Sequence, residues 1–325
     1  MKQSTNDLNA VTASSTASKL KNLRGLDLFR TLSWAAAVAT VLLLGWIVLE
    51  IATQAIPSIK AFGLHFIFNA QWNPNTEQYG VLAFVVGTAV SSLLALLMAL
   101  PLGIAIAILL SENFLPLSLR QTLRFVVELL AAIPSVVYGL WGITVVVPIV
   151  QHLGQGLAKY LGFIPLFRGP AFGNSLLTAS LVLALMVLPT ISAISRTALV
   201  NVPKTLREGA YALGATRWEA LFGIILPAAG PAIVAATILG FGRALGETMA
   251  VAMIIGNSPR LTFSLLSPAG TLASLLANQF AEAEGLQVSA LMYAALLLML
   301  LTLMVNIAGR LILKRTEQAA ATHIR

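Results

Sequence analysis

The chain has 325 residues, of which 58% are hydrophobic and only 10% charged, with a net charge of +8. Soluble domains carry about a quarter charged residues, so this composition excludes an ordinary soluble enzyme. The positive charges stand mostly at the ends of apolar blocks, which argues against a nucleic-acid partner, and the absence of cysteine excludes disulfides and thiolate metal sites.

The apolar residues form blocks of about 20 or more, long enough to cross a lipid membrane as helices. A spanning backbone must satisfy its own hydrogen bonds, and the short alternating segments of a β-barrel are not visible in the sequence. We therefore expect an all-α, polytopic membrane protein with six transmembrane helices. They are predicted at about 31–53, 80–110, 124–150, 173–200, 231–256 and 288–312.

The segments around the spans follow from composition. Residues 1–30 are polar and rich in Ser, Thr and Asn, and we expect a disordered cytoplasmic tail, not a signal peptide. Residues 54–79 form a periplasmic connection between the first span and a five-helix core at 80–312. Residues 313–325 form a second cytoplasmic tail.

Orientation follows from the basic residues. Fifteen of the 20 Lys and Arg residues fall on one side of the predicted spans. Because basic residues favour the cytoplasmic side, both termini are expected in the cytoplasm. The fifteen are Lys2, Lys19, Lys21, Arg24, Arg30, Arg120, Arg124, Arg196, Lys204, Arg207, Arg217, Arg310, Lys314, Arg315 and Arg325.

The last outer connection, at about 257–287, predicts a short helix. Ser267-Pro268 has the pattern of an N-cap followed by proline at the first helical position. Apolar residues then recur at helical spacing as far as Phe280. Such an amphipathic helix would lie at the outer surface, either covering a pore or simply resting in the interface.

The connection at 201–227 predicts a compact helix-turn-helix. Pro203 can open a helix, and Gly214 suits the position that ends one. Leu206, Ala210 and Leu213 would share one helical face. Thr216 then begins a Thr-x-x-Glu capping box for a second helix.

The same connection resembles the EAA loop of ATP-binding-cassette (ABC) importer permeases. The residues that keep the family spacing are Glu208, Ala210, Gly214, Ile224, Leu226 and Pro227. Gly209 replaces the second alanine of the pattern, which lowers helix propensity locally. The resemblance implies the type I ABC importer permease fold, with this loop acting as the coupling helix that docks on an ATPase.

Two further stretches, 128–142 and 242–251, resemble the phosphate-specific permeases, and the ending Glu-Thr-Met-Ala-Val resembles the PstC-like branch. This resemblance implies the bacterial inner membrane and a second, PstA-like permease. It also implies two cytoplasmic ATPase copies and a periplasmic or surface phosphate-binding protein. The chain contains no Gly-x-x-x-x-Gly-Lys-Ser/Thr loop, so we expect ATP hydrolysis on a partner, with no catalytic residue or cofactor here.

Arg243 and Glu247 are charged residues within a predicted span, one helical turn apart. An isolated charge there costs about 2.5–3.5 kcal/mol, so the two are expected to pair. A guanidinium suits phosphate oxygens, and we place Arg243 and Glu247 in the substrate path. A purely structural ion pair is the alternative. Glu128 lies in the 128–142 stretch that resembles the phosphate-specific permeases, so we also place it in the substrate path. A local ion pair with Arg124, four residues earlier, is the alternative interpretation.

Three other functions stay open from the sequence. A permease for sulfate or molybdate would share the coupling loop. A secondary transporter or channel independent of an ATPase would need coupling-ion carboxylates or internal repeats. An intramembrane enzyme would need converging nucleophiles, and the predicted spans contain no His or Asp.

Overall fold

The structure is a computed structural model that describes the backbone of residues 4–112 and 114–323. Side chains are described for residues 29–112, 114–316 and 318. Six helical segments in this part of the chain are long and apolar enough to cross a membrane, which confirms the expected number. They are Phe29–Phe62, Leu82–Ser111, Ser135–Leu161, Leu176–Val200, Arg217–Leu245 and Leu286–Thr316.

The chain divides into two units, residues up to Thr53 and residues from Gln54 onward. The first unit consists of helix α1 (Ser4–Phe62), which continues into the second unit. The polar segment expected to be disordered is therefore helical from Ser4, and residues 1–3 lie outside the described residues. Extending an existing helix costs less than nucleating one, which explains how weak helix formers continue the apolar segment.

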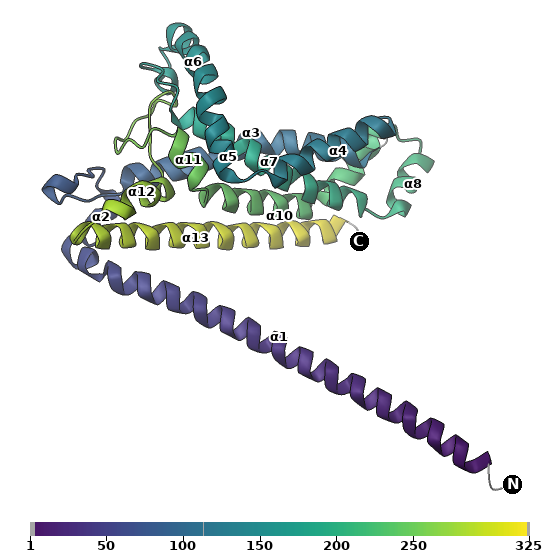
Figure 1. Ribbon diagram of the computed structural model, residues 1–325. Coiled ribbons are helices and arrows are strands. Elements are labelled where there is room, and N and C mark those ends of the chain that lie inside the picture. The colour runs from purple at the N-terminus through teal and green to yellow at the C-terminus, as the bar shows by residue number, and fades with distance from the viewer. Residues whose placement is uncertain (1–3, 113, 324–325) are drawn as a thin grey trace. The chain divides into compact units, whose positions relative to one another are not determined.

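The second unit is built on helices that run side by side. These are α3 (Leu82–Ser111), α7 (Leu176–Val200), α10 (Leu226–Leu245) and α13 (Leu286–His323), and Figure 1 shows α13 along α10. Small residues let the backbones approach closely. A Cβ on Gly103 of α3 would lie 2.9 Å from Ile191 of α7, and one on Gly240 of α10 would lie 3.0 Å from the same Ile191 side chain. Ile191 thus joins three helices.

The third span begins eleven residues later than the sequence suggests. Residues 124–132 belong to a separate amphipathic helix, α4 (Leu117–Ala132), which ends before Pro134. Ile133 has extended backbone angles because the residue before a proline disfavours the helical region. The span itself consists of α5 (Ser135–Trp141), a π-helical turn (Gly142–Val146) and α6 (Val147–Leu161).

The fifth span is also displaced, to 217–245 in place of 231–256. It consists of α9 (Arg217–Ala220), a π-helical turn (Leu221–Ile225) and α10. The span does not begin at Pro227. Proline has no backbone N–H to donate, but the wider π-helical turn before it lets the helix continue through this position. The helix ends instead at Gly246, and a separate helix, α11 (Met249–Ile254), follows.

The outer connections form a hydrophobic cluster with the adjoining helix ends. Helix α1 continues to Phe62, and Ala55 in its last part is buried in this cluster. The connection between the first two spans is therefore 63–81 and not the expected 54–79. Phe66 of α2 (His65–Phe68) stacks on Tyr293 with ring centroids 4.5 Å apart. The remaining short helices of the connections are 3-10 turns at Pro74–Thr76, Pro165–Phe167 and Phe280–Glu282.

The helix expected after Ser267-Pro268 begins later, as α12 (Leu272–Gln279). Its N-cap is Thr271, whose hydroxyl accepts from the Ser274 N–H at 3.1 Å. Pro268 belongs to the loop before it, where the neighbouring Ala269 N–H donates to the Ile255 carbonyl. Leu272 and Leu275 are buried, so α12 packs into the protein and does not rest only on its surface.

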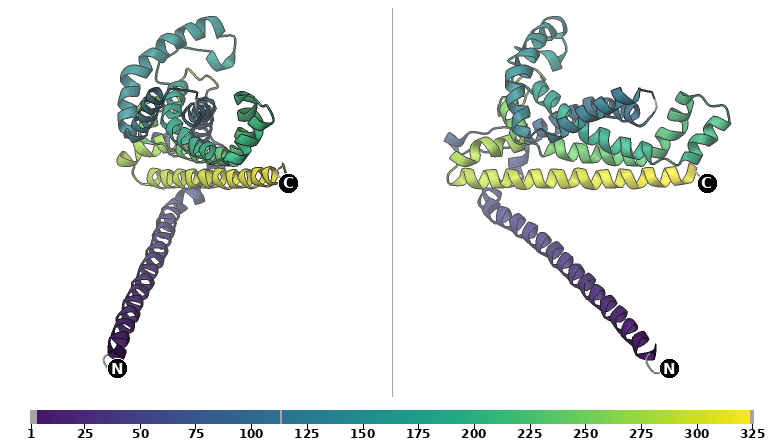
Figure 2. Two further views of the ribbon diagram at one scale, coloured as in Figure 1. Left: turned by 90° about the vertical axis from the view of Figure 1, so that its right-hand side faces the viewer. Right: turned by 45° about the vertical axis from the view of Figure 1, so that its right-hand side comes forward.

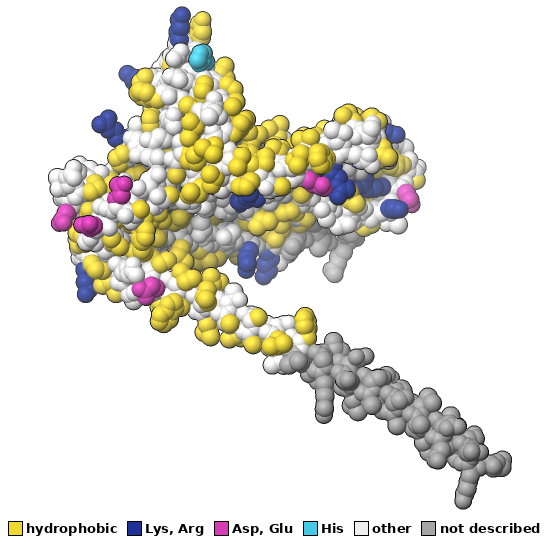
Figure 3. Space-filling view, viewed as in Figure 1, with side chains coloured by type: hydrophobic (Ala, Val, Ile, Leu, Met, Phe, Trp, Pro, Cys, Tyr) yellow, Lys and Arg dark blue, Asp and Glu magenta, His cyan; other side chains and the backbone are white. Residues whose placement is uncertain are grey.

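The second unit has two distinct ends. Figures 1 and 2 place α8 (Lys204–Ala212) and the end of α13 at one end, with α2, α6 and α12 toward the other. Hydrophobic side chains cover much of the flank in Figure 3, and Lys and Arg side chains gather where α8 lies. The 201–227 connection and the end of α13 therefore lie on the same side, as the basic residues predict.

Candidate functional site

The 201–227 connection contains the predicted first helix, turn and capping box, but its second helix is the start of the fifth span. Helix α8 starts directly after Pro203. Gly214 has φ of +86°, a left-handed conformation that other residues rarely adopt. The Thr216 hydroxyl accepts from the Glu219 N–H at 3.3 Å, and the Glu219 carboxylate accepts from the Thr216 N–H at 2.7 Å. The capping box is thus complete, and the connection is a fixed shape.

Helix α8 has an inner and an outer face. Ala210 is buried on the inner face, and Leu206 packs there against the cluster described below. Glu208 and Gly209 are exposed on the outer face. Leu213 is 90% exposed, so its expected place on the inner face is wrong, because α8 ends at Ala212. An exposed leucine beside Glu208 gives the outer face an apolar contact point for a partner.

The second half of the motif anchors the connection. Ile224 is half-buried in the π-helical turn, and Leu226 and Pro227 open α10. Leu226 and Leu206 both pack against one apolar cluster at this end of the bundle. The buried members of that cluster are Ala107, Leu199, Val202, Leu221, Ile225, Ala229 and Ile233. Both halves of the motif therefore attach to the same core.

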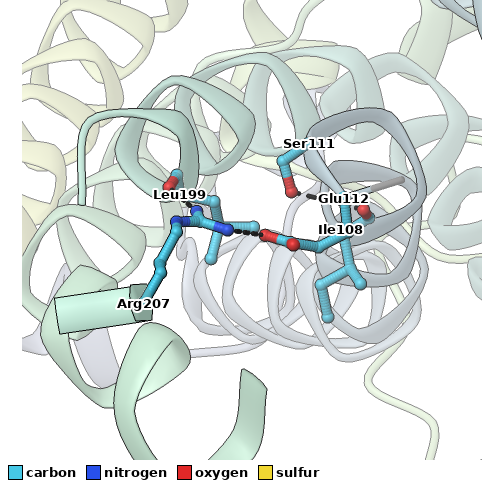
Figure 4. Close-up of polar contacts among 5 residues, drawn as sticks. All are labelled: Ile108, Ser111, Glu112, Leu199 and Arg207. Carbon is cyan, nitrogen blue, oxygen red and sulfur yellow. Dashed lines mark hydrogen bonds and ion pairs between the residues drawn. The ribbon is translucent and has the colours of Figure 1, made fainter. Parts of the chain in front are cut away.

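Arg207, next to the motif glutamate, makes two short contacts (Figure 4). Its Nη1 lies 2.6 Å from Glu112 Oε1, and its Nη2 donates to the Leu199 carbonyl at 2.6 Å. Glu112 directly follows α3, and Leu199 is in the last turn of α7. Sequence reasoning missed Glu112 because it is 95 residues from Arg207; its only signal was an isolated carboxylate at the end of a span.

A second contact holds the connection to the end of α3. The ring of Phe114 stacks on Trp218 with centroids 4.8 Å apart, and Trp218 in turn stacks on Phe222 at 5.9 Å. A cavity of about 520 Å³ lies beside this stack, between Glu112 and Tyr211. The ion pair and the aromatic stack thus tie the two helices of the connection to α3 independently.

Arg243 and Glu247 do not form the expected ion pair, although both side chains are described. Gly246 ends α10, so Glu247 is not one turn further along the same helix. Arg243 lies in the last turn of α10, and the Glu247 carboxylate accepts from the Ala250 N–H at the start of α11, at 3.4 Å. Arg243 is at the C-terminal end of α10 and Glu247 is at the N-terminal end of α11. Each charge is therefore stabilised by a helix dipole and not by the other charge.

The exposed Arg243 side chain lines a cavity of about 390 Å³ between α7, α10 and α13. Its Nη1 donates to the Thr190 hydroxyl at 3.3 Å. Asn306 of α13 also lines the cavity and has no hydrogen-bond partner among the described residues. Sequence reasoning missed Thr190 and Asn306, although an amide within an apolar span was a visible signal.

The cavity continues toward the α8 end. A second hollow of about 470 Å³ shares Leu239 and Asn306 with it and reaches Arg310. Nearer the other end, an apolar hollow of about 460 Å³ is lined by Thr248 of the break and by α12 and α13. Residues of α13 line all three hollows.

Glu128 lies away from this cavity, on α4. Its carboxylate is 2.7 Å from Arg124 Nε, and the two side chains are 62% and 55% exposed. The local i, i+4 pair that the sequence offered as the alternative is therefore the arrangement that the structure shows.

Comparison with known families covers most of the chain. A family model described as "Binding-protein-dependent transport system inner membrane component" matches residues 99–318. A phosphate transport system permease protein PstC from Pasteurella multocida is 43% identical over 90% of this chain and 92% of its own length. The PstC protein of Haemophilus influenzae is also 43% identical, over 90% and 94%. A probable PstC from Methanocaldococcus jannaschii is 37% identical over 92% and 96%.

Solved structures of ABC importers share the fold. An inward-facing MetNI methionine transporter matches with a TM-score of 0.52 and 20% identity, over 73% of this chain and 94% of that chain. A bacterial transporter for the polysaccharide alginate matches with a TM-score of 0.53 and 16% identity, over 83% and 96%. At these identities the likeness shows the type I importer permease fold, and it confirms the fold expected from the coupling loop.

Proposed function

Because the chain belongs to the family of binding-protein-dependent transport system inner membrane components, we propose that it is a membrane-spanning subunit of an ATP-driven phosphate importer. The PstC relatives, which match about nine-tenths of this chain, are named as phosphate transport system permease proteins. The chain forms half of the translocation path. It is a transport subunit and not an enzyme, and a partner chain hydrolyses ATP.

The observation that carries this proposal is the shape of the coupling loop. Helix α8 is fixed from inside by Leu206 and Ala210 while Glu208, Gly209 and Leu213 remain exposed. A short helix that presents one face in this way suits docking into a groove of a partner. The partner is a cytoplasmic ATPase, present in two copies, one for this chain and one for a PstA-like permease.

The placement in the cell follows from the same assignment. The protein lies in the bacterial inner membrane with α8 and both termini in the cytoplasm, in agreement with the basic residues at the α8 end. A periplasmic or surface phosphate-binding protein delivers the substrate to the opposite end, where α12 and α2 lie.

The mechanism is alternating access. ATP binding closes the two ATPases and moves the coupling helices, which opens the spans toward the binding protein. Phosphate then enters the cavity between α7, α10 and α13. Hydrolysis of ATP returns the spans to the state that is open to the cytoplasm.

Arg243 is the residue that meets phosphate. A guanidinium keeps its charge in a poorly solvated site and presents a planar fork of donors to phosphate oxygens. Thr190 and Asn306 line the same cavity and add neutral hydrogen-bonding groups. Glu247, four residues away across the Gly246 break, limits how tightly an anion is held, because a nearby carboxylate repels it.

A strain lacking this chain tests the proposal. Uptake of radiolabelled phosphate should fall in the deletion strain under phosphate starvation and return when the chain is supplied. Sulfate and molybdate uptake, measured in parallel, should not change. Loss of sulfate or molybdate uptake instead would assign a different oxyanion, and transport by the purified chain without an ATPase would refute the ATP-driven mechanism.

A further inference from the structure

An ion pair at the α8 end belongs neither to the exposed face of α8 nor to the cavity that Arg243 lines. Arg207 and Glu112 are joined at 2.6 Å, and their side chains are only 20% and 13% exposed. Most exposed ion pairs contribute little, but a largely buried pair leaves a costly unpaired charge when one partner is removed. We therefore expect the pair to stay intact. Through Arg207 it joins three elements: α8, the end of α3 and the end of α7.

We propose that the Arg207–Glu112 pair transmits the movement of coupling helix α8 to α3 and α7. The inference rests on the proposed function, since it concerns how ATP-driven motion reaches the path. Arg207 and Glu208 are consecutive residues of the rigid helix α8; the Arg207 side chain is half-buried and that of Glu208 is exposed. A partner that pushes the outer face therefore moves the Arg207 guanidinium as well.

The two contacts of Arg207 act on helix ends. Glu112 is the C-cap of α3, and its N–H donates to the Ile108 carbonyl. A displacement of the Glu112 carboxylate would therefore move the end of α3 (Figure 4). The Leu199 carbonyl is in the last turn of α7, where a positive charge is favourable. One guanidinium thus holds the ends of two packed spans at a fixed distance from the coupling helix.

Helix α7 then connects this end to the substrate cavity. It carries Leu199 at one end and, nine residues earlier, Thr190, which contacts Arg243. Pro189 lies next to Thr190 inside the helix, and prolines are the usual sites of helix kinks. A displacement at Leu199 would therefore change the position of the Thr190 hydroxyl relative to Arg243.

The aromatic stack makes the proposal testable. Phe114 and Trp218 keep the connection attached to the end of α3 without the ion pair. Removing a charge at Glu112 or Arg207 should lower stability at this end, but the aromatic stack should keep the connection and the ATPase docking face in place. What should change is the amount of phosphate moved for each ATP hydrolysed.

The experiment uses the full complex in proteoliposomes with the binding protein, and it measures phosphate uptake and ATP hydrolysis together. Glu112→Gln and Arg207→Gln should lower phosphate moved per ATP by about two- to thirtyfold, the size of effect typical of residues that couple distant sites. Arg207→Lys, which keeps the charge but loses the forked geometry, should give an intermediate ratio. It also serves as the test if the Gln variants fail to assemble.

The matched control is Arg124→Gln, which breaks the exposed Arg124–Glu128 pair within α4 and leaves Glu128 in place. Its ratio should equal that of the unaltered protein. An unchanged ratio in Arg207→Lys, Arg207→Gln and Glu112→Gln, or an equal loss in Arg124→Gln, would overturn the inference. Uptake and hydrolysis falling in proportion, with less ATPase bound, would also overturn it and assign the pair to docking. Failure of the unaltered complex to import phosphate would instead refute the proposed function.

Discussion

Arg207 and Arg243 are two arginines in contrasting surroundings. The Arg207 guanidinium is largely buried and has a carboxylate and a carbonyl at 2.6 Å. The exposed Arg243 side chain lines a cavity, and its guanidinium donates to the neutral Thr190 hydroxyl at 3.3 Å. One charge is already satisfied by the chain, and the other remains available for an anion.

The difference teaches how to separate a structural charge from a functional one in an apolar protein. A charge within a span costs about 2.5–3.5 kcal/mol, so it is kept only where something compensates it. Arg207 lies outside the spans, on α8, and Glu112 compensates its largely buried charge. Arg243 is compensated by the carboxyl end of α10, which stabilises the charge without occupying its donors.

The largest expected effect is at Arg243. Arg243→Gln should reduce phosphate uptake about a hundredfold, because a hydrogen bond to a charged group contributes up to about 3 kcal/mol. Assembly with the ATPase should be normal, as judged by co-purification. The matched control is Arg260→Gln, an exposed arginine in an outer loop. Uptake that persists in Arg243→Gln would show that the free guanidinium has no transport role and that the contrast with Arg207 is accidental.

The next effect is at the docking face. Leu213→Ser should weaken ATPase binding by at least about tenfold, since burying a leucine side chain contributes about 1.5–3 kcal/mol. Leu261→Ser, at the outer end, is the control for an exposed leucine. Binding can be measured with immobilised permease and purified ATPase. Equal binding by both variants would place the partner elsewhere.

A smaller effect is expected at the turn of the coupling loop. Gly214→Ala should destabilise the turn by about 1 kcal/mol, because the left-handed conformation disfavours any Cβ. No neighbouring atom lies within 4 Å of a Cβ there, so crowding is not the cause. Gly230→Ala in α10, equally uncrowded, is the control and should not destabilise. Limited proteolysis of the loop in both variants measures the difference.

The smallest effect is at the position where the chain departs from the motif. Gly209→Ala should stabilise α8 by about 0.5–1 kcal/mol, since Gly209 is helical and a Cβ would meet nothing within 4 Å. The readout is proteolysis of the loop, with ATPase binding unchanged or slightly tighter. Weaker binding would mean that the partner needs close backbone approach at this point.

The sequence predicted the local features well. The turn at Gly214 and the Thr216 capping box depend on residues within one or two turns of each other, and both are found. The number of spans follows from long apolar blocks and is also found. Such local patterns predict the structure correctly because few tertiary contacts favour a different local conformation.

Other features could not be read from local spacing. Glu112 pairs with a residue far along the chain, and only the packing of α3 against α7 brings them together. The Arg243–Glu247 pairing failed because it assumed that the helix continues past Gly246. The boundaries at Pro134 and Pro227 differ because one proline ends a helix and the other is accommodated by a π-helical turn.

Direct binding of inorganic phosphate tests the contrast between the two arginines most directly. The purified permease–ATPase complex, without the binding protein, would be titrated with phosphate for the unaltered chain, Glu112→Gln and Arg243→Gln. The account predicts equal affinity for the first two and loss of binding in Arg243→Gln. Phosphate binding that is unchanged in Arg243→Gln, or lost in Glu112→Gln, would contradict it.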